Sequence, residues 1–207
     1  MDQQNAQLLS PESASDEQLV THSLAGNHAA FEALVHSYDA RLLGYIRHVL
    51  GHNEDDEQAY DVLQCVLLQF YLSLPTLSTR QSLKPWLFRV AYNRCVDELR
   101  VRRRRKQRVI HFSELEGGKN EEEYSLIALI QDTQPSPEEV VEHDDATREL
   151  RHAIQGLPLT YRSVVLLRCL YDMSFREIAQ ALKMPEATAK TYFYRARPHL
   201  RAALMRS

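Results

Sequence analysis

A segment from Pro85 to Arg108 carries many of the side chains that could recognise a nucleic acid. On a helix of 3.6 residues per turn, one face is apolar and holds Leu87, Phe88, Ala91, Tyr92, Cys95 and Leu99. The opposite face holds Trp86, Arg89, Asn93, Asp97, Arg100 and Arg104. Guanidinium groups match phosphate oxygens and base edges, and an aromatic ring can stack on an unpaired base. This face therefore predicts contact with a nucleic acid.

Two features of this segment have structural alternatives. Trp86 could instead close the end of a small core, because Trp is usually largely buried, and both interpretations stay open. The basic run Arg102 to Arg105 and Lys106 could be a solvated helix end. Five adjacent cations repel one another unless an anion is present, so the run favours a polyanionic partner.

The charge of the chain alternates in four blocks. The 207 residues carry a net charge of -3, which divides into -9 for 1–61, +9 for 62–108, -10 for 109–147 and +7 for 148–207. A protein that meets one polyanion along its whole length would be basic throughout. Two separate basic blocks predict two nucleic-acid contacts, with acidic surfaces that avoid nucleic acid or meet a basic partner.

Composition excludes several classes of protein. No apolar run could cross a bilayer, and the polar, acidic amino terminus is unlike a secretory signal, so we expect a cytoplasmic protein without membrane contact. Cys65, Cys95 and Cys169 lie singly in apolar helical patterns, which predicts small buried hydrophobic residues rather than metal ligands. No phosphate loop, nucleophile motif or ligand cluster occurs, so we expect no enzyme activity, cofactor or metal.

Apolar periodicity predicts an all-α fold of two small helical domains joined by an acidic flexible linker. After a disordered tail over 1–15, the first domain spans 16–106 and the linker spans 107–137. Ser15 and Gln18 form a capping box at the start of the first domain. Its helices are expected at about 15–26, 28–50, 54–74 and 85–108. The third helix is apolar almost all round, which predicts a central place in the bundle.

The second domain, 138–207, has the pattern of a helix-turn-helix. Helices are expected up to Gln155 and then over 160–171, 174–182 and 186–204. In the second of these we expect the core positions Tyr161, Val164, Val165, Leu167 and Leu170, and we expect solvent at Arg162 and Arg168. The outer face of the last helix holds Lys190, Thr191, Tyr194, Arg195, Arg197 and Arg201. No acid follows Glu186, as expected of a recognition helix in a major groove.

Three segments resemble the sigma-70 family, especially its extracytoplasmic-function (ECF) group. The resemblance is to region 4 in LPLTYRSVVLLRCLYDMSFREIAQALKMPEATAKTYFYRARPHL, to regions 2.3 and 2.4 in KPWLFRVAYNRCVDELRVRRRR, and to region 2.2 in DEQAYDVLQCVLLQFYLSL. It covers about 16–105 and 138–205. The resemblance implies a dissociable subunit that binds RNA polymerase core, directs it to promoters and helps to open the duplex.

The resemblance also implies roles for individual residues. Asp61 and Gln64 would meet the clamp helices of the largest polymerase subunit, and the flap is a second expected contact of core. Cys65 departs from the Glu that is usual there, which puts one polar contact in doubt. Residues expected at the minus-ten element and in melting are Trp86, Arg89, Asn93, Asp97, Arg100, Arg103 and Arg104. Those expected at the minus-thirty-five element are Thr188, Lys190, Thr191, Tyr194, Arg195 and Arg197.

Other implications stay open at this stage. The resemblance implies no contact for Tyr192, which stands where Arg or another polar residue is common. The loop Thr76 to Leu83 is the expected place for a pocket that traps an unstacked base. The acidic linker, including Glu121 to Glu123, either mimics nucleic acid in the polymerase cleft or is a solvated tether. An anti-sigma factor is a partner that the family allows, although no residue requires one. The alternative function is a stand-alone helix-turn-helix regulator.

Overall fold

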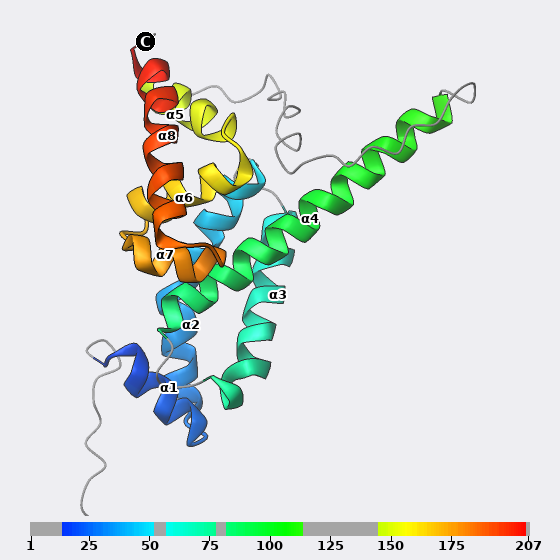
Figure 1. Cartoon of the computed structure of the whole chain (residues 1–207). Coiled ribbons are helices and arrows are strands. Elements are labelled where there is room, and N and C mark those ends of the chain that lie inside the picture. Colours follow the sequence, from blue (N-terminus) through cyan, green and yellow to red (C-terminus); the bar gives the residue numbers. More distant parts are fainter. Residues whose placement is uncertain (1–13, 52–56, 78–81, 114–144, 206–207) are drawn as a thin grey trace, which may run out of the picture.

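The computed structural model describes residues 14–51, 57–77, 82–113 and 145–205, and every regular element in these ranges is a helix (Figure 1). The predicted all-α class is therefore confirmed. The first half holds α1 (Asp16–Leu24), α2 (His28–Leu50), α3 (Glu57–Ser73), the short 3₁₀ helix η1 (Leu74–Thr76) and α4 (Leu83–Ser113). The second half holds α5 (Asp145–Gln155), α6 (Leu159–Cys169), α7 (Phe175–Leu182) and α8 (Glu186–Leu204).

Local signals set the ends of the first two helices. Ser15 caps α1 and forms the predicted capping box with Gln18. At the start of α2, the side chain of Asn27 accepts a hydrogen bond from the backbone N–H of Ala30 at 3.2 Å. The same helix ends at Gly51, whose φ of 74° lies in the left-handed region that favours glycine. Sequence signals therefore give correct limits for both helices.

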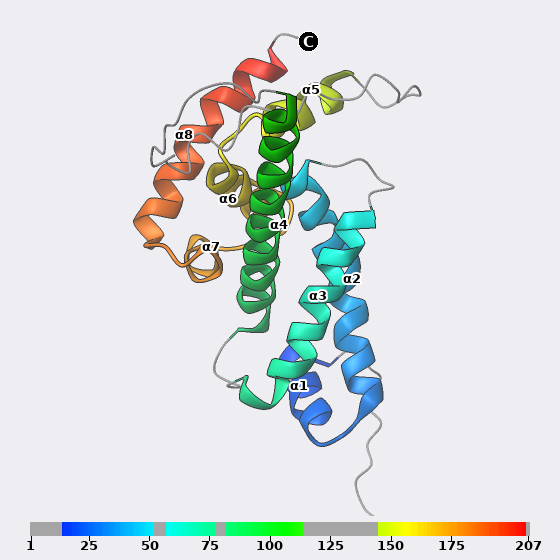
Figure 2. The same cartoon turned by 90° about the vertical axis from the view of Figure 1, so that its right-hand side faces the viewer.

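The long helix α4 passes beside α2 and α3 on one side and beside α7 on another (Figure 2). Pro85 lies in its first turn, where a missing N–H does not interrupt the helix. The helix continues to Ser113, so the first seven residues of the predicted linker, 107–113, are helical. The remainder of that linker lies outside the described residues.

The predicted central position of α3 is wrong, because α3 lies at the edge of the bundle against α2 and α4 (Figure 2). Val62, Val66 and Phe70 are buried. Leu68 and Leu72 point outward and are 59% and 67% exposed. A helix that is apolar on every side can be buried all round, or it can expose one apolar side that binds a partner. Periodicity alone does not distinguish these two arrangements.

Four burial predictions, for two residues in or next to α6 and for two of the cysteines, are also wrong. Arg162, expected in solvent, is buried, whereas Leu170, expected in the core, is 52% exposed. The helix ends at Cys169, so the neighbouring Tyr171 takes the buried place instead. Cys95 is buried as predicted, but Cys65 and Cys169 are exposed. Both lie on outward sides of their helices, where an apolar neighbourhood in sequence does not imply burial.

The two halves share one continuous core instead of standing apart. Buried residues of α2 and α4 pack with buried residues of α6 and α7 in a single cluster. The ring of Tyr171 lies 5.0 Å from that of Phe88 and 5.9 Å from that of Tyr45, measured between centroids. Arg162 is buried here because its Nη1 donates to the carbonyl of Val49, at the end of α2, at 2.8 Å.

The helix-turn-helix consists of α7 and α8. A second capping box begins α7: Ser174 Oγ accepts from the backbone N–H of Glu177 at 3.2 Å, and Glu177 Oε2 accepts from the N–H of Ser174 at 2.8 Å. Lys183 ends the helix with a left-handed φ of 50°. Pro185 precedes the first residue of α8, and α8 continues through Pro198. These signals end α7 and begin α8 within three residues.

Two further absences apply to the described residues only. None of their helices has the length and apolar character needed to cross a membrane. They also contain no group of three or more His, Cys, Asp or Glu side chains that could hold a metal ion.

The capping box of α7 predicts a pH dependence of stability. Burial raises the pKa of Glu177, but the hydrogen bonds from Ser174 and the charge of Lys84 lower it more, so its pKa lies below the usual value. The charged form therefore stabilises the fold above the unfolded pKa of about 4.3, and this contribution is lost as the pH falls through the folded pKa. Glu177→Gln keeps an acceptor but removes the charge.

We expect Glu177→Gln to lower the free energy of unfolding near pH 6, and the difference from the wild type to shrink below about pH 4. Urea unfolding at a series of pH values measures it. The solvent-facing Glu32→Gln on α2 is the control, because it should give a smaller and flatter difference. A Glu177→Gln effect that does not change between pH 6 and pH 3 would contradict the role of the charge.

Candidate nucleic-acid interface

The predicted nucleic-acid face of α4 is largely open. Asn93, Asp97, Arg100 and Arg104 are exposed, and Trp86, Arg89 and Arg103 are partly buried. The opposite side of the helix is in the core, where Leu87, Phe88, Ala91 and Cys95 are buried. The helix therefore divides into a packed side and an open side as its periodicity predicts. The seven residues expected at the minus-ten element lie along α4, and all retain some accessible surface.

Trp86 packs against the core but is not fully enclosed. Its ring packs against the core and lies 6.1 Å from the ring of Phe70 on α3, between centroids. The ring is only partly buried, so some of its surface remains accessible. A ring that is anchored on one side and open on the other is a rigid stacking platform, because little conformational entropy is lost when a base stacks on it.

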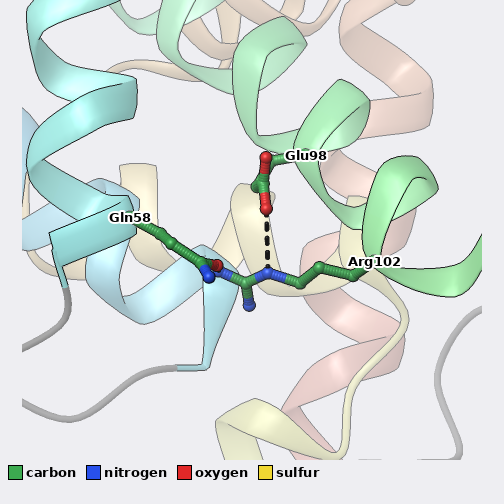
Figure 3. Close-up of polar contacts among 3 residues, drawn as sticks. All are labelled: Gln58, Glu98 and Arg102. Carbon is green, nitrogen blue, oxygen red and sulfur yellow. Dashed lines mark hydrogen bonds and ion pairs between the residues drawn. The ribbon is translucent and has the colours of Figure 1, made fainter. Parts of the chain in front are cut away.

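Arg102 turns away from the open face of α4, although it begins the basic run. Its Nε donates to Glu98 Oε1 at 3.1 Å, and its Nη2 donates to Gln58 on α3. Figure 3 shows the side chain extending from α4 toward Gln58, with Glu98 one helical turn away. Part of the charge of the run is therefore compensated within the protein. Arg104 and Arg105, by contrast, are exposed.

Asp97 and Arg100 partner each other on the open face. Arg100 Nη1 lies 3.5 Å from Asp97 Oδ1, and both side chains are more than half exposed. An exposed pair at this distance contributes little to stability. Arg100 can therefore leave Asp97 for a phosphate at small cost, so the pair does not prevent DNA contact.

The outer face of α8 is exposed along its length. Lys190, Thr191, Tyr194, Arg195, Arg197 and Arg201 are all exposed, as the sequence predicts. Thr188 is partly buried near the start of the helix, and Ala189 and Ala196 face the core. The ammonium group of Lys190 lies 2.7 Å from the carboxylate of Glu186, one turn earlier. This face presents cations and hydrogen-bond donors of the kinds that bind phosphates and base edges.

Tyr192 belongs to the packed part of the second half. Its ring stacks on that of Tyr161 at 4.5 Å between centroids, with an interplanar angle of 18°. This contact gives a structural reason why no DNA role is assigned to Tyr192, and it joins α8 to α6.

Phe175 is a positioning residue that sequence reasoning missed. Its ring lies 5.6 Å from that of Phe193, with the guanidinium of Arg168 at 5.3 Å and the ammonium of Lys190 at 6.0 Å from the ring centroid. Cation–π attraction at such distances is modest at exposed sites. The ring nevertheless couples α6, α7 and α8 around the first turns of α8. The only sequence signal was an aromatic residue directly after the capping Ser174.

The outer side of α3 forms a second candidate surface. Asp61, Gln64, Cys65, Leu68 and Leu72 are all exposed, and their spacing places them along one side of the helix. The sequence pointed to Asp61 and Gln64, but it did not single out the two leucines. Two large exposed aliphatic side chains beside polar groups are typical of a protein-binding surface. The predicted base pocket in the loop 76–83 falls mainly on residues 78–81, outside the described residues.

Models of known protein families match both halves of the chain. The family model described as Sigma-70 region 2 matches residues 34–105, and the one described as Sigma-70, region 4 matches residues 147–200. The RNA polymerase sigma-H factor of Pseudomonas aeruginosa is 28% identical over 189 residues, which cover 91% of this chain and 93% of that protein. The ECF RNA polymerase sigma factor SigW of Bacillus subtilis is 26% identical over 179 residues, which cover 86% and 91%.

Solved structures of similar fold include CnrH in complex with the cytosolic domain of CnrY, with a TM-score of 0.62 at 21% identity over 93% of this chain and 98% of that one. The sigma factor RpoE in complex with the anti-sigma factor NepR from Bartonella quintana has a TM-score of 0.61 at 18% identity over 84% and 96%. At these identities the likeness concerns the fold. The two regions match in their expected order, and the curated relatives include ECF sigma factors. The chain therefore belongs to the sigma-70 family of RNA polymerase sigma factors, within the extracytoplasmic-function group.

Proposed function

We propose that this sigma factor reads the minus-thirty-five element with α8 and the minus-ten element with α4 while α3 holds RNA polymerase core. The observation that carries the proposal is the pair of exposed basic faces, one on α4 in the half that matches region 2 and one on α8 in the half that matches region 4. A regulator that contacts DNA only through a helix-turn-helix does not require the basic face on α4.

The minus-thirty-five contact follows from the geometry of the helix-turn-helix. A recognition helix enters the major groove with its amino-terminal residues at the base edges, while later residues meet the backbone. Lys190, Thr191 and Arg195 lie on the exposed side of α8, between about one and two and a half turns from its start. Tyr194 lies beside them and is 58% exposed. Arg197 lies further along and is placed for a phosphate, and Thr188 lies near the helix start.

The minus-ten contact follows from the open side of α4. Strand opening requires that unstacked bases be held, and extruding each one costs a few kcal/mol. Trp86 supplies a stacking surface, while Asn93 and Asp97 supply groups that can bond to base edges. Arg89, Arg100, Arg103 and Arg104 supply positive charge for the strand backbone. No residue in this scheme performs covalent chemistry, so we propose an initiation factor without enzyme activity of its own.

The contact with polymerase is assigned to the outer side of α3. Asp61 and Gln64 would meet the clamp helices of the largest subunit, and Leu68 and Leu72 would add apolar contact area beside them. The flap of core would be met by the second half. Cys65 stands at the centre of this surface where the family usually has Glu, so its contact is apolar here. These assignments place the protein in the cytoplasm, where polymerase and chromosome are found.

The proposed domains are those expected from the sequence, 16–106 and 138–207, with the stretch between them acting as a tether or as a nucleic-acid mimic. Deletion of Glu121 to Glu123 separates these roles, because only a mimic should change the yield of abortive transcripts. An anti-sigma factor is a further partner in this proposal, since the Bartonella relative was solved with one.

The proposal is tested by mixing the purified chain with bacterial RNA polymerase core and cognate promoter DNA. We expect co-elution with core and initiation that depends on the chain. Binding to duplex DNA without affinity for core would overturn the proposal and favour a stand-alone helix-turn-helix regulator.

Arg195→Ala should weaken binding to the minus-thirty-five element by about 1 to 3 kcal/mol if Arg195 reads a base edge, and it should relax the preference at one position. Equal losses on all sequences would make Arg195 a phosphate contact instead. Tyr192→Phe is the control on the same helix, because its ring is stacked on Tyr161 and it should leave DNA affinity unchanged. Fluorescence anisotropy with systematically varied duplexes measures both variants.

Arg102 and Arg104 form a matched pair on α4. Arg102→Ala should lower the free energy of unfolding by about 1 kcal/mol, because it removes the hydrogen bonds to Glu98 and Gln58. Arg104→Ala should leave stability unchanged but weaken promoter binding and reduce its salt slope by about one unit. Thermal unfolding and salt titrations of promoter binding measure the two effects. The reverse pattern would mean that the run meets DNA through Arg102.

Leu68→Ala should weaken binding to polymerase core without lowering the melting temperature, because the side chain is exposed in the free protein. Leu170→Ala is the control, since Leu170 is exposed to a similar degree but lies in the second half, away from α3. Competition for core against a labelled sigma factor gives the relative affinities. Wild-type affinity in the Leu68 variant would exclude this side of α3 as the contact.

A further inference from the structure

Glu186 is the first residue of the recognition helix α8, and none of the DNA contacts described above involves it. It is also the one acid in the sequence of this helix, which otherwise carries only basic charge. The phosphates of DNA repel a carboxylate, so an acid at this place lowers affinity unless it accepts a hydrogen bond from a donor on the DNA. Glu186 is therefore favourable at the start of a DNA-binding helix only where a specific contact offsets that repulsion.

Glu186 and Lys190 form one donor–acceptor pair. Lys190 Nζ lies 2.7 Å from Glu186 Oε1, and the side chains of Lys190 and Glu186 are 49% and 45% exposed. An exposed pair one turn apart contributes little to stability. Each group keeps bonding capacity beyond the pair, because an ammonium has three donors and a carboxylate accepts about four hydrogen bonds. The pair therefore presents a donor and an acceptor side by side at the surface.

The position of Lys190 is restricted from a second direction. Its ammonium lies 6.0 Å from the centroid of the Phe175 ring on α7, and that ring packs edge-on against Phe193 at 5.6 Å between centroids. A lysine is usually a mobile point charge with little preference for one acceptor geometry. Here the carboxylate and the ring together hold the ammonium, so less side-chain entropy is lost when it donates to a base.

The pair lies where a recognition helix meets base edges. Amino-terminal residues of such a helix contact the bases, while later ones contact the backbone. Glu186 begins α8 and Lys190 follows one turn later, so their polar ends meet in the first turns of the helix. Thr191, the next residue, donates its hydroxyl proton to the carbonyl of Ala187 at 2.9 Å. Its donor is used within the helix, whereas those of Lys190 remain available.

A G·C base pair presents the complementary groups in the major groove. Guanine offers two acceptors, N7 and O6, and cytosine offers the donor N4. N4 and O6 are bonded to each other in the base pair, so they lie about 2.9 Å apart. This spacing matches the 2.7 Å between Glu186 Oε1 and Lys190 Nζ. The carboxylate can therefore accept from N4 while the ammonium donates to O6 and N7.

The order of these groups distinguishes all four base pairs when the helix keeps one register. A T·A pair in the orientation of the G·C pair offers O4 to the ammonium and N6 to the carboxylate, but the methyl group of thymine replaces the second acceptor N7. The reversed pairs, C·G and A·T, place an amino group at the ammonium and an oxygen at the carboxylate. Both charged groups then face groups that cannot pair with them, which is unfavourable inside a groove.

We propose that Glu186 is a specificity-determining residue: together with Lys190 it reads one G·C base pair of the minus-thirty-five element, with guanine on the Lys190 side, and excludes the reversed pair. The proposal rests on the proposed function of α8 and deepens it by naming the base pair and its orientation. Because Glu186 and Lys190 together carry no net charge, they add base preference without adding non-specific affinity for phosphates, in contrast to the arginines further along the helix.

The test measures how RNA polymerase core reconstituted with the full chain binds promoter duplexes. A promoter selected by the wild-type holoenzyme from a random pool supplies the reference, and each base pair of its minus-thirty-five element is changed in turn to the other three. At one position we expect affinity to fall in the order G·C, T·A and then the two reversed pairs, with a loss of about tenfold or more between first and last. If no position follows this order, the reading of a G·C pair is excluded.

Glu186→Gln keeps the side-chain length and an acceptor oxygen but removes the charge that holds Lys190. We expect this variant to lose most of the difference between G·C and C·G at that position. On unrelated DNA it should bind more tightly, with a salt slope steeper by about one unit, because Lys190 then meets a phosphate. Glu32→Gln is the matched control, since Glu32 is an exposed acid in the other half and its loss should change neither quantity. Undiminished preference for G·C in the Glu186 variant would contradict the proposal.

Exchange of the two residues gives a stricter test. The double variant Glu186→Lys and Lys190→Glu keeps opposite charges one turn apart but exchanges donor and acceptor. We expect its preference at the same position to invert from G·C to C·G, while far-ultraviolet circular dichroism shows the helical content of the wild type. A double variant that still prefers G·C would exclude the reading of one base pair by the two groups together.

The outcomes distinguish this proposal from the proposed function. A holoenzyme without any base preference in the minus-thirty-five element would overturn the assignment of α8 to that element, and the reading by Glu186 would fall with it. Base preferences that are present in the wild type and unchanged in both Glu186 variants would overturn the role of Glu186 alone.

Discussion

The contact of Tyr171 with Phe88 and Tyr45 is the constraint on which the arrangement of this protein depends. It joins a half that matches region 2 to a half that matches region 4. Two sets of helices, separated in the sequence by the 31 residues between α4 and α5, therefore form one core. Aromatic rings suit this position because they bury a large area with few rotatable bonds. The same contact draws Arg162 into the interior, since its partner carbonyl at Val49 belongs to the other half.

The long helix α4 has to satisfy two demands along one rod. Its packed side supplies Phe88 to the contact with Tyr171 and Leu87 and Cys95 to the core, while its open side keeps polar and basic groups in solvent. A single helix can do this because residues three and four apart share a side, so the two sets of residues never compete for one position. Arg102 lies at the boundary between the packed side and the open side. Its guanidinium group donates hydrogen bonds to Glu98 and Gln58.

The sequence was sufficient for most of the local structure. Capping residues such as Ser15 and Ser174 and the stop at Gly51 act within a few residues, so the limits of α1, α2 and α7 could be read from the chain, and the exposed face of α8 followed from its 3.6-residue period. The sequence did not indicate which apolar or charged residues of one half contact the other half. Arg162 was misplaced because its burial depends on the carbonyl of Val49 in α2, 113 residues away in the sequence. Leu170 was misplaced because α6 ends at Cys169 and Tyr171 takes the buried place.

The same distinction between local and long-range signals applies to the candidate sites. Arg195 and Asn93 could be named because a helical period and a family pattern both place them on an open side. Phe175, Leu68 and Leu72 were not singled out, since their significance lies in which neighbours they have or lack in space.

Because α4 and α5 belong to one chain, the contact between the halves is intramolecular. Its extent does not depend on the concentration of the protein, unlike the association of two separate subunits. Dilution or a burst of synthesis therefore leaves the packing of the halves unchanged.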